Sequence, residues 1–196
     1  MLFTPKDFGT GIFELDGISK KTVEEHLKLY NGYVNKSNEV MEKLPKVDLS
    51  TANQVFSDAR ALKVELSFAV GGMQNHEIYF SHLKKNGGEP QGELRKQIEK
   101  DFGSVEQYLK DLKASGLSAR GWAWTVWFPA VGKLVNWVGD SQNTYLSWDL
   151  KPLLALDVYE HAYLLDHGVN RGAYIDAFLK NLDWDRIGDS YSKARK

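Results

Sequence analysis

Charged and titratable side chains interrupt an otherwise apolar stretch in the last quarter of the chain. In LALDVYEHAYLLDHG, residues 154–168, Asp157, Glu160 and His161 stand among Leu, Val, Tyr and Ala. Burying a charge among apolar side chains is costly unless a partner compensates it. The spacing of four residues would place Asp157 and His161 on one face of a helix that begins near Asp157. We therefore treat this pair as a candidate part of a metal site.

Two further histidines lie in apolar or aromatic surroundings: His76 in QNHEIYF and His26 in EEHLKLYNGYV. Three imidazoles and one carboxylate make four ligands suited to a first-row metal ion, with room left for solvent or substrate. Simpler interpretations stay open at this point. Asp157 could be only a helix N-cap, and each histidine could be an ordinary core or helix-flank residue.

Composition excludes several other classes of protein. Lys and Arg number 25 against 26 Asp and Glu, so there is no electrostatic case for a nucleic-acid or membrane partner. The start, MLFTPKDFGTG, lacks the pattern of a signal peptide, and no apolar run approaches the ~20 residues of a membrane helix. Cysteine is absent, which excludes disulfides and thiolate sites. We expect a cytoplasmic protein.

The elements that must position these residues fall into two halves. Apolar residues at helical spacing predict one helix from about Ser19 to Leu44 and a second from about Ser50 to Leu83. Gly71 and Gly72 interrupt the second, which suggests a close backbone approach or a kink there. A short connection between two long amphipathic helices predicts an antiparallel hairpin. The Gly- and Pro-rich stretch 84–94 is the best candidate linker. We expect domains at 1–86 and 87–196.

The second half changes its period. Two short helices are expected between residues 90 and 115, and then GWAWTVWF and KLVNWVG alternate with a period of two. A third strand is predicted over residues 145–156, followed by the helix that begins near Asp157. The fold class is therefore α+β: an N-terminal antiparallel helical hairpin followed by an α/β domain with a three-stranded antiparallel sheet.

The motifs, taken in chain order, resemble those of the iron/manganese superoxide dismutases. DVYEHAY at 157–163 is similar to the family signature DVWEHAY. Further matches extend along most of the chain: YVN at 33–35, GGMQNH at 71–76, GEPQGEL at 88–94, DFGS at 101–104 and GWAW at 121–124. The resemblance implies the same hairpin and three-stranded sheet that the periodicity predicts.

The resemblance also implies an activity and a ligand set. The family converts superoxide to dioxygen and hydrogen peroxide at one manganese or iron ion per subunit. The residues that match its metal ligands are His26, His76, Asp157 and His161. A metal-free structural relative of the dismutases is the alternative, although such a protein should have lost several ligands. A di-metal oxidase or hydrolase would need Glu-x-x-His on two helices, and the chain lacks that spacing.

Other matches imply roles around the metal. Gln142 in GDSQN matches the outer glutamine of the manganese-type arrangement, whose iron-type counterpart would stand at Gly72; we therefore prefer manganese, with iron as the alternative. Tyr33 matches the tyrosine that links this glutamine to bulk water. Tyr30 stands where the family's gateway histidine would be. A phenol titrates near pH 10, so proton delivery would differ there.

The first ligand depends on how the first helix is aligned. Ungapped alignment back from Tyr33 puts Glu25 at the ligand position, whereas a one-residue deletion puts His26 there. A second anionic ligand would stabilise the +3 state of the metal and shift its potential away from the range that dismutation needs. His26 and Tyr33 are seven residues apart and share a helix face. We therefore expect His26 to be the ligand.

The resemblance implies a homodimer and an aromatic pocket wall. In the family, the glutamate of the signature reaches the ligand histidine of the other subunit, which would place Glu160 and Tyr163 at the interface. Trp122 and Trp124 match the pocket wall. Where most relatives carry tryptophan, this chain has Tyr159 and Phe80, which keep an aromatic ring at each position.

Overall fold

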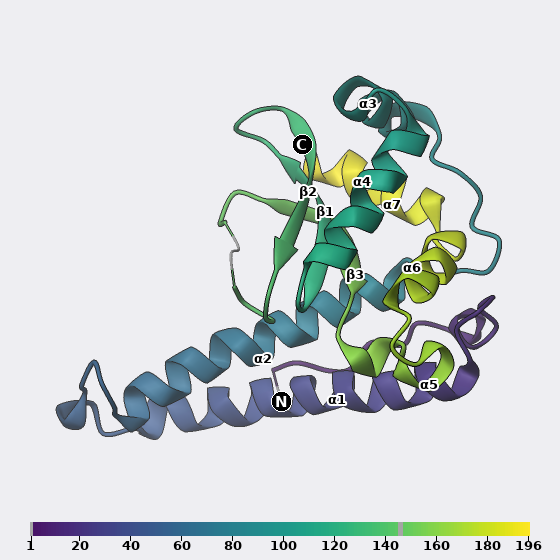
Figure 1. Ribbon diagram of the computed structural model, residues 1–196. Helices are drawn as coiled ribbons and strands as arrows, with labels where there is room; N and C mark the ends of the chain where they lie inside the picture. The colour runs from purple at the N-terminus through teal and green to yellow at the C-terminus, as the bar shows by residue number, and fades with distance from the viewer. Residues whose placement is uncertain (1, 145–146) are drawn as a thin grey trace.

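The first half of the molecule is an antiparallel pair of long helices, as predicted. The computed structural model describes residues 2–144 and 147–196. Helix α1 (Lys20–Lys43) and helix α2 (Asp58–Ser81) lie side by side, and their connected ends project away from the rest of the molecule (Figure 1). Ser19 caps α1, because its side chain accepts a hydrogen bond from the backbone N–H of Thr22. Ser57 caps α2 in the same way through Arg60.

The start of the second helix differs from the prediction. Residues 50–57 are not part of α2; instead, short 3₁₀ turns cover Leu44–Lys46 and Leu49–Thr51. Pro45 lies within the first of these turns, and Asp48 caps the second through the N–H of Ser50. Local capping thus overrides the apolar spacing here. The two glycines do not interrupt α2, which runs continuously through Gly71 and Gly72.

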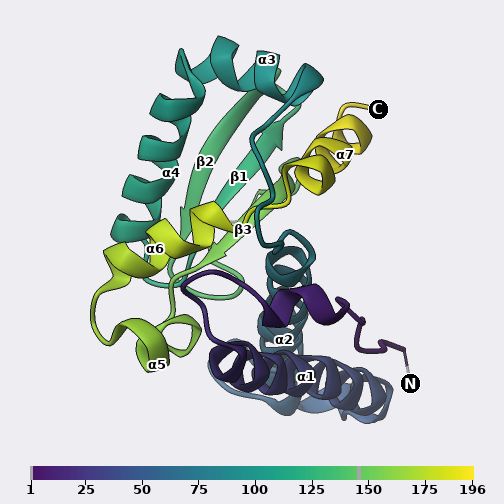
Figure 2. The ribbon, with the colours of Figure 1, turned by 90° about the vertical axis from the view of Figure 1, so that its right-hand side faces the viewer.

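The second half contains the predicted three-stranded antiparallel sheet. Helices α3 (Gly92–Phe102) and α4 (Val105–Ser118) precede β1 (Trp122–Phe128), β2 (Lys133–Gly139) and β3 (Lys151–Asp157). The strand order is β2-β1-β3, so β1 is central. Helix α4 lies against β1 and β2 (Figure 2), where the hydroxyls of Tyr108 and Thr125 are 2.7 Å apart.

The third strand is shorter than expected. It begins at Lys151, and residues 147–150 lie outside it. Positions 145 and 146, with which the predicted strand starts, lie outside the described residues. A register shift opposite Thr125 and Val126 marks an irregularity in the pairing of β1 with β3. The ladder still pairs Trp122 with Asp157, and this pairing sets Asp157 at the end of the sheet that faces the hairpin.

Three further helices complete the chain: α5 (Leu164–His167), α6 (Arg171–Lys180) and α7 (Trp184–Ala194). The segment after α2 is joined to the segment between α6 and α7. Lys84 N–H donates to the carbonyl of Asn181 at 2.7 Å, and Asp183 N–H donates to the carbonyl of His82 at 2.6 Å. These bonds connect the hairpin to the C-terminal helices.

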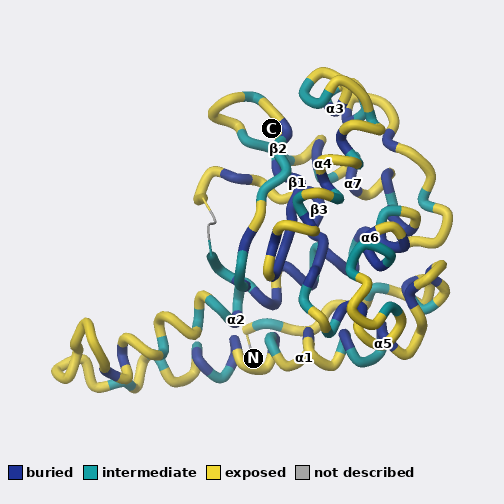
Figure 3. Tube along the Cα trace, viewed as in Figure 1, coloured by how far each residue is buried: buried dark blue, intermediate teal, exposed yellow. Residues whose placement is uncertain are grey.

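Burial is concentrated where the two halves meet. Buried segments follow the sheet and the parts of α1 and α2 beneath it, whereas the far end of the hairpin is mostly exposed (Figure 3). None of the described helices combines the length and the apolar character needed to cross a membrane. The site residues identified from the sequence lie in the buried region between the halves.

Candidate metal centre

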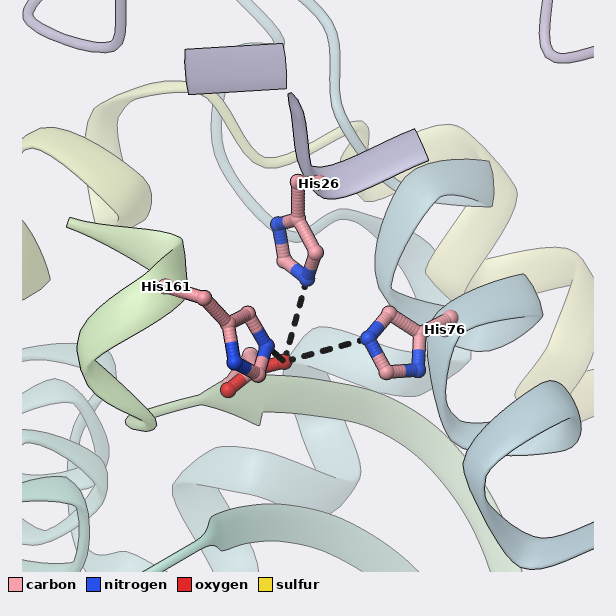
Figure 4. Close-up of side chains that lie close together, drawn as sticks. His26, His76 and His161 are labelled. Atoms are coloured by element: carbon pink, nitrogen blue, oxygen red, sulfur yellow. Dashed lines mark hydrogen bonds and ion pairs between the residues drawn. The ribbon is translucent and has the colours of Figure 1, made fainter. Parts of the chain in front are cut away.

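Four side chains from four different segments converge beneath the sheet. His26 comes from the second turn of α1, His76 from the last third of α2, Asp157 from the end of β3, and His161 from a 3₁₀ turn over Glu160–Ala162. Figure 4 shows the three imidazoles directed at one carboxylate oxygen. One ligand atom from each residue lies within 4.8 Å of the others. The structure therefore brings together all four residues that the sequence nominated.

The prediction of a helix that begins near Asp157 is wrong. Asp157 is the last residue of β3, and Val158 and Tyr159 separate it from the turn that carries His161. The chain turns because the Oδ1 atom of Asp157 accepts the N–H of Tyr159 at 2.9 Å. Since the other oxygen of Asp157 remains directed into the site, a strand end and a turn achieve what a helix face was expected to do.

The three histidines surround the same atom. The Nε2 atoms of His161, His26 and His76 lie 3.1, 3.2 and 3.6 Å from Oδ2 of Asp157. His26, His76 and Asp157 are buried, whereas the side chain of His161 is 31% exposed. His161 is thus the side of the site nearest to solvent.

The hydrogen bond of His76 shows that this donor set fits a metal ion. Its Nδ1 atom lies 2.6 Å from the carbonyl oxygen of Gly72; because a carbonyl can only accept, Nδ1 carries the proton and Nε2 carries a lone pair. Among the described residues, this buried Nε2 has no hydrogen-bond partner. A lone pair that faces a carboxylate oxygen is repulsive unless a cation lies close to both. Three nitrogens and one oxygen suit a first-row ion.

Electrostatics keep these groups in the protonation states that bind metal. Burial and the neighbouring His26 lower the pKa of His76 to about 3, and burial lowers the pKa of His26 as well. Burial opposes ionisation of Asp157, but the charge and hydrogen bonds of His161 and His26 outweigh it and hold the pKa of Asp157 below its usual range. Near neutral pH the cluster therefore offers neutral imidazoles at His26 and His76 and a carboxylate at Asp157.

A chain of hydrogen bonds runs beside the cluster through Gln142. Its amide nitrogen donates to the hydroxyl of Tyr33 at 3.2 Å, and its amide oxygen accepts the indole N–H of Trp122 at 3.0 Å. The ring of Tyr33 lies 5.3 Å from that of His76. Gln142 is buried and Tyr33 is partly exposed, so the chain connects the interior with the surface.

The paired glycines of α2 make room for this chain of hydrogen bonds. A Cβ atom on Gly72 would lie 2.6 Å from the ring of Tyr33, and one on Gly71 would lie 2.4 Å from the carbonyl oxygen of Gln142. Only glycine allows the two approaches. A glutamine at position 72 would require the Tyr33 ring to move, because its first carbon would lie 2.6 Å from that ring.

Asn75 is a residue of the site for which the sequence suggested no role. Its side-chain nitrogen donates to the carbonyl of Gln142 at 3.0 Å, and its oxygen accepts the indole N–H of Trp124 at 3.2 Å. It thereby holds the loop of Gln142 against α2 and the sheet. The signal was available: a polar residue directly before His76, on the face of α2 that also carries buried Gly72 and Tyr79.

Two residues of α1 that the sequence analysis considered lie outside the cluster. The carboxylate of Glu25 is on the surface with Lys21 and Lys28. Tyr30 is buried, and its hydroxyl bonds to Lys6 and Glu77.

Aromatic rings flank the imidazoles. Phe80 lies 4.9 Å from His26, Trp122 lies 5.2 Å from His76, and Tyr159 stacks on His161 at 5.4 Å between ring centroids. These rings form an apolar wall around the cluster.

The two residues predicted to lie at the homodimer interface differ in exposure. Glu160 is exposed. Tyr163 is 4% exposed, stacks on Tyr174, and accepts a hydrogen bond from the side chain of Arg171 at 3.4 Å.

Comparison with known families matches nearly the whole chain. The family model described as iron/manganese superoxide dismutases, alpha-hairpin domain, matches residues 16–84, and the corresponding C-terminal domain model matches residues 90–190. These two ranges together contain the four clustered residues.

Curated relatives carry the names of both metals. A protein named superoxide dismutase [Fe] from Aquifex aeolicus is 43% identical over 187 residues, which cover 93% of this chain and 88% of the relative. A protein of the same name from Cupriavidus metallidurans is 37% identical over 199 residues, covering 99% and 98%. Superoxide dismutase [Mn] from Haloarcula marismortui is 41% identical over 120 residues, covering 61% and 59%.

Proposed function

Because the chain belongs to the iron/manganese superoxide dismutase family, we propose that it dismutates superoxide with one manganese or iron ion held by His26, His76, Asp157 and His161. The observation that carries the proposal is the meeting of three imidazole nitrogens at one buried carboxylate oxygen. Each expected domain, 1–86 and 87–196, supplies two of the four side chains, so the site would require both.

The protein's own contribution is to hold the metal and to handle protons. A bound ion would supply the electron exchange through its +3/+2 couple, with one superoxide oxidised to dioxygen and another reduced to hydrogen peroxide. Three neutral imidazoles and a single carboxylate keep the ligand charge at −1. Asp157 is fully buried, so its charge is only weakly screened by solvent.

The formation of each molecule of hydrogen peroxide consumes two protons, which must reach the buried site. We assign their delivery to the hydroxyl of Tyr33, which the amide of Gln142 holds in place by donating to it at 3.2 Å. Burial and the charge of Asp157 raise the pKa of Tyr33, so its hydroxyl keeps its proton near neutral pH and can donate it. Trp122 fixes the amide of Gln142 by donating to its oxygen, which orients the amide nitrogen towards Tyr33.

We propose manganese as the preferred ion. The support is the position of the glutamine: Gln142 reaches the site from the segment after β2, while the Tyr33 ring fills the space beside Gly72. Separate reconstitution with manganese and with iron tests this preference. An active iron form beside an inactive manganese form would reverse it.

We propose a homodimer with Glu160 and Tyr163 at its interface. Glu160 is exposed and forms no ion pair with any described residue, and the nearby Leu165 and Val169 are 60% and 89% exposed. Glu160 would accept a hydrogen bond from His161 of the other subunit and so fix that imidazole, while Tyr163 would support Arg171 behind the interface. Sedimentation tests this: a monomer at micromolar concentration would contradict it.

The activity is tested by metal exchange. Protein stripped of metal should be inactive, and reloading with manganese or iron should restore dismutation of superoxide. Zinc serves as the control, because it has no accessible redox couple and should occupy the site without restoring activity. Full activity of the zinc form would refute redox dismutation, and a purified protein that binds no metal would favour the metal-free alternative.

A further inference from the structure

The N-terminal segment, residues 2–9, runs along the hairpin and is anchored to α1 by Asn38. The side-chain oxygen of Asn38 accepts the N–H groups of Leu2 and Phe3, each at 2.9 Å. Its side-chain nitrogen donates to the carbonyl of Phe3 at 2.8 Å. Asn38 is itself buried. An extended segment that lies before the first turn of the chain is thus fixed on the helix pair rather than left in solvent.

Further along the same segment, three polar groups join α1 to α2. The hydroxyl of Tyr30, on α1, accepts the N–H of Lys6 at 2.9 Å and donates to Glu77, on α2, at 3.2 Å. The second oxygen of Glu77 lies 2.5 Å from the ammonium nitrogen of Lys6. Tyr30 stands one helical turn after His26, and Glu77 directly follows His76. The bridge therefore ties the two helices at the level of their histidines.

Aromatic contacts connect the same bridge to the imidazoles. The ring of Phe8, at the end of the segment, lies 5.5 Å from that of Tyr30 and 5.2 Å from that of Phe80. Phe80, one turn after His76, in turn lies 4.9 Å from His26 and 6.4 Å from His76. A continuous packed layer leads from the segment to both helix-borne histidines.

We propose that the N-terminal segment is a clamp that fixes the spacing of His26 and His76, with Tyr30 as its central positioning residue. Residues 2–9 hold α1 and α2 together through the Lys6–Tyr30–Glu77 bridge and the Phe8–Phe80 contact. Tyr30 acts on the metal through the placement of the two helices, and its hydroxyl is committed to Lys6 and Glu77.

The physical reason is that two ligands on separate helices bind one ion well only if the helices keep a fixed separation. A site held within a fraction of an ångström binds more tightly than one that must be assembled. Mutation of a residue that orients a ligand without touching the metal typically lowers metal affinity by roughly 10- to 100-fold. This inference rests on the proposed metal site.

Tyr30→Phe tests the clamp, because it removes only the hydroxyl and keeps the ring. Tyr108→Phe is the matched control: both tyrosines are 1% exposed, and the hydroxyl of Tyr108 is also hydrogen-bonded, to Thr125 on the sheet. Full-length protein is loaded with Mn²⁺ and its release to an excess of chelator is timed. The Mn²⁺ paramagnetic resonance spectrum is recorded for each variant.

We expect Tyr30→Phe to release Mn²⁺ about tenfold faster than wild type and to show an altered resonance spectrum, while Tyr108→Phe matches wild type in both. Equal release and equal spectra for the two variants would overturn the clamp, whatever their thermal stabilities. If Tyr30→Phe does not fold, Asn38→Ala decides: it frees residues 2 and 3 at a distance from the histidines. Faster release from it supports the clamp, and release at the wild-type rate overturns it. These readouts do not depend on dismutase activity, so a protein that holds Mn²⁺ without dismutating superoxide would refute the proposed function alone.

Discussion

The two halves of the site position their ligands by different physical means. His26 and His76 stand within long helices, where backbone hydrogen bonds and the packing of α1 on α2 fix both side chains. Asp157 and His161 stand at a strand end and in a 3₁₀ turn, where one bond from Tyr159 to Asp157 turns the chain. Helix periodicity therefore specifies the first pair, whereas the second pair depends on the sheet ladder and a local turn.

Asp157→Asn should have the largest effect, because it removes the only negative charge at the centre of the cluster. Metal affinity should fall by more than roughly 100-fold, which exceeds the loss typically caused by mutating a residue that does not touch the metal. Measurement of bound metal per chain checks this. Retention of one ion per chain would show that the three histidines suffice without the carboxylate, and would contradict the expected loss.

His26→Ala and Glu25→Ala sharpen the description of the hairpin half. We expect His26→Ala to lose metal, because a buried ligand is removed, and Glu25→Ala to keep it, because that carboxylate lies on the surface with Lys21 and Lys28. Metal content and dismutase activity are measured for both variants. Loss of metal in the Glu25 variant, with normal content in the His26 variant, would reverse the assignment.

Gly72→Ala tests the close approach of the helices. The new Cβ would lie 2.6 Å from the Tyr33 ring, and overpacking of this kind typically costs about 1–3 kcal/mol of unfolding free energy. Gly32→Ala on α1 is the matched control: its Cβ would meet nothing within 4 Å, so it should stabilise the helix by up to about 1 kcal/mol. Denaturant unfolding compares the two. A Gly72→Ala variant as stable as wild type would contradict the contact.

His82 tests how the halves are joined. It is buried beside the link to Asp183, and burial together with the charge of Arg186 lowers its pKa to about 3. Unfolded histidine titrates near pH 6.5. Below that value the unfolded chain binds more protons than the folded chain, so the free energy of unfolding decreases as the pH is lowered. The slope from this group is about 1.4 kcal/mol per pH unit. His82→Gln should have a shallower slope between neutral pH and about pH 5; an unchanged slope would contradict this.

The hairpin was predicted from the sequence more accurately than the geometry around Asp157 was. Apolar spacing was enough for α1, and alternation was enough for β1 and β2. Asp157 was placed on a helix because a spacing of four fits a helix face, while the turn that replaces it depends on a single hydrogen bond. Sequence periodicity carries no information on such a bond.

Long-range contacts account for the rest. The reason for Gly72 lies in the ring of Tyr33, on the other helix. The partners of Tyr30 lie in an extended segment without periodicity and on the neighbouring helix. The paired glycines suggested a close approach, but no local pattern could name the partner in either contact. Resemblance to a family could name the four clustered residues, because motif order reflects the fold as a whole.

X-ray absorption at the metal edge tests the central claim most directly, namely that both halves hold one ion together. The metal-loaded wild type should show three imidazole ligands with one additional protein oxygen. The imidazole count should fall to two in His76→Ala, from the hairpin, and equally in His161→Ala, from the C-terminal half, in whatever metal each variant retains. A shell of oxygens alone, or an imidazole count that changes in only one of the two variants, would contradict the account.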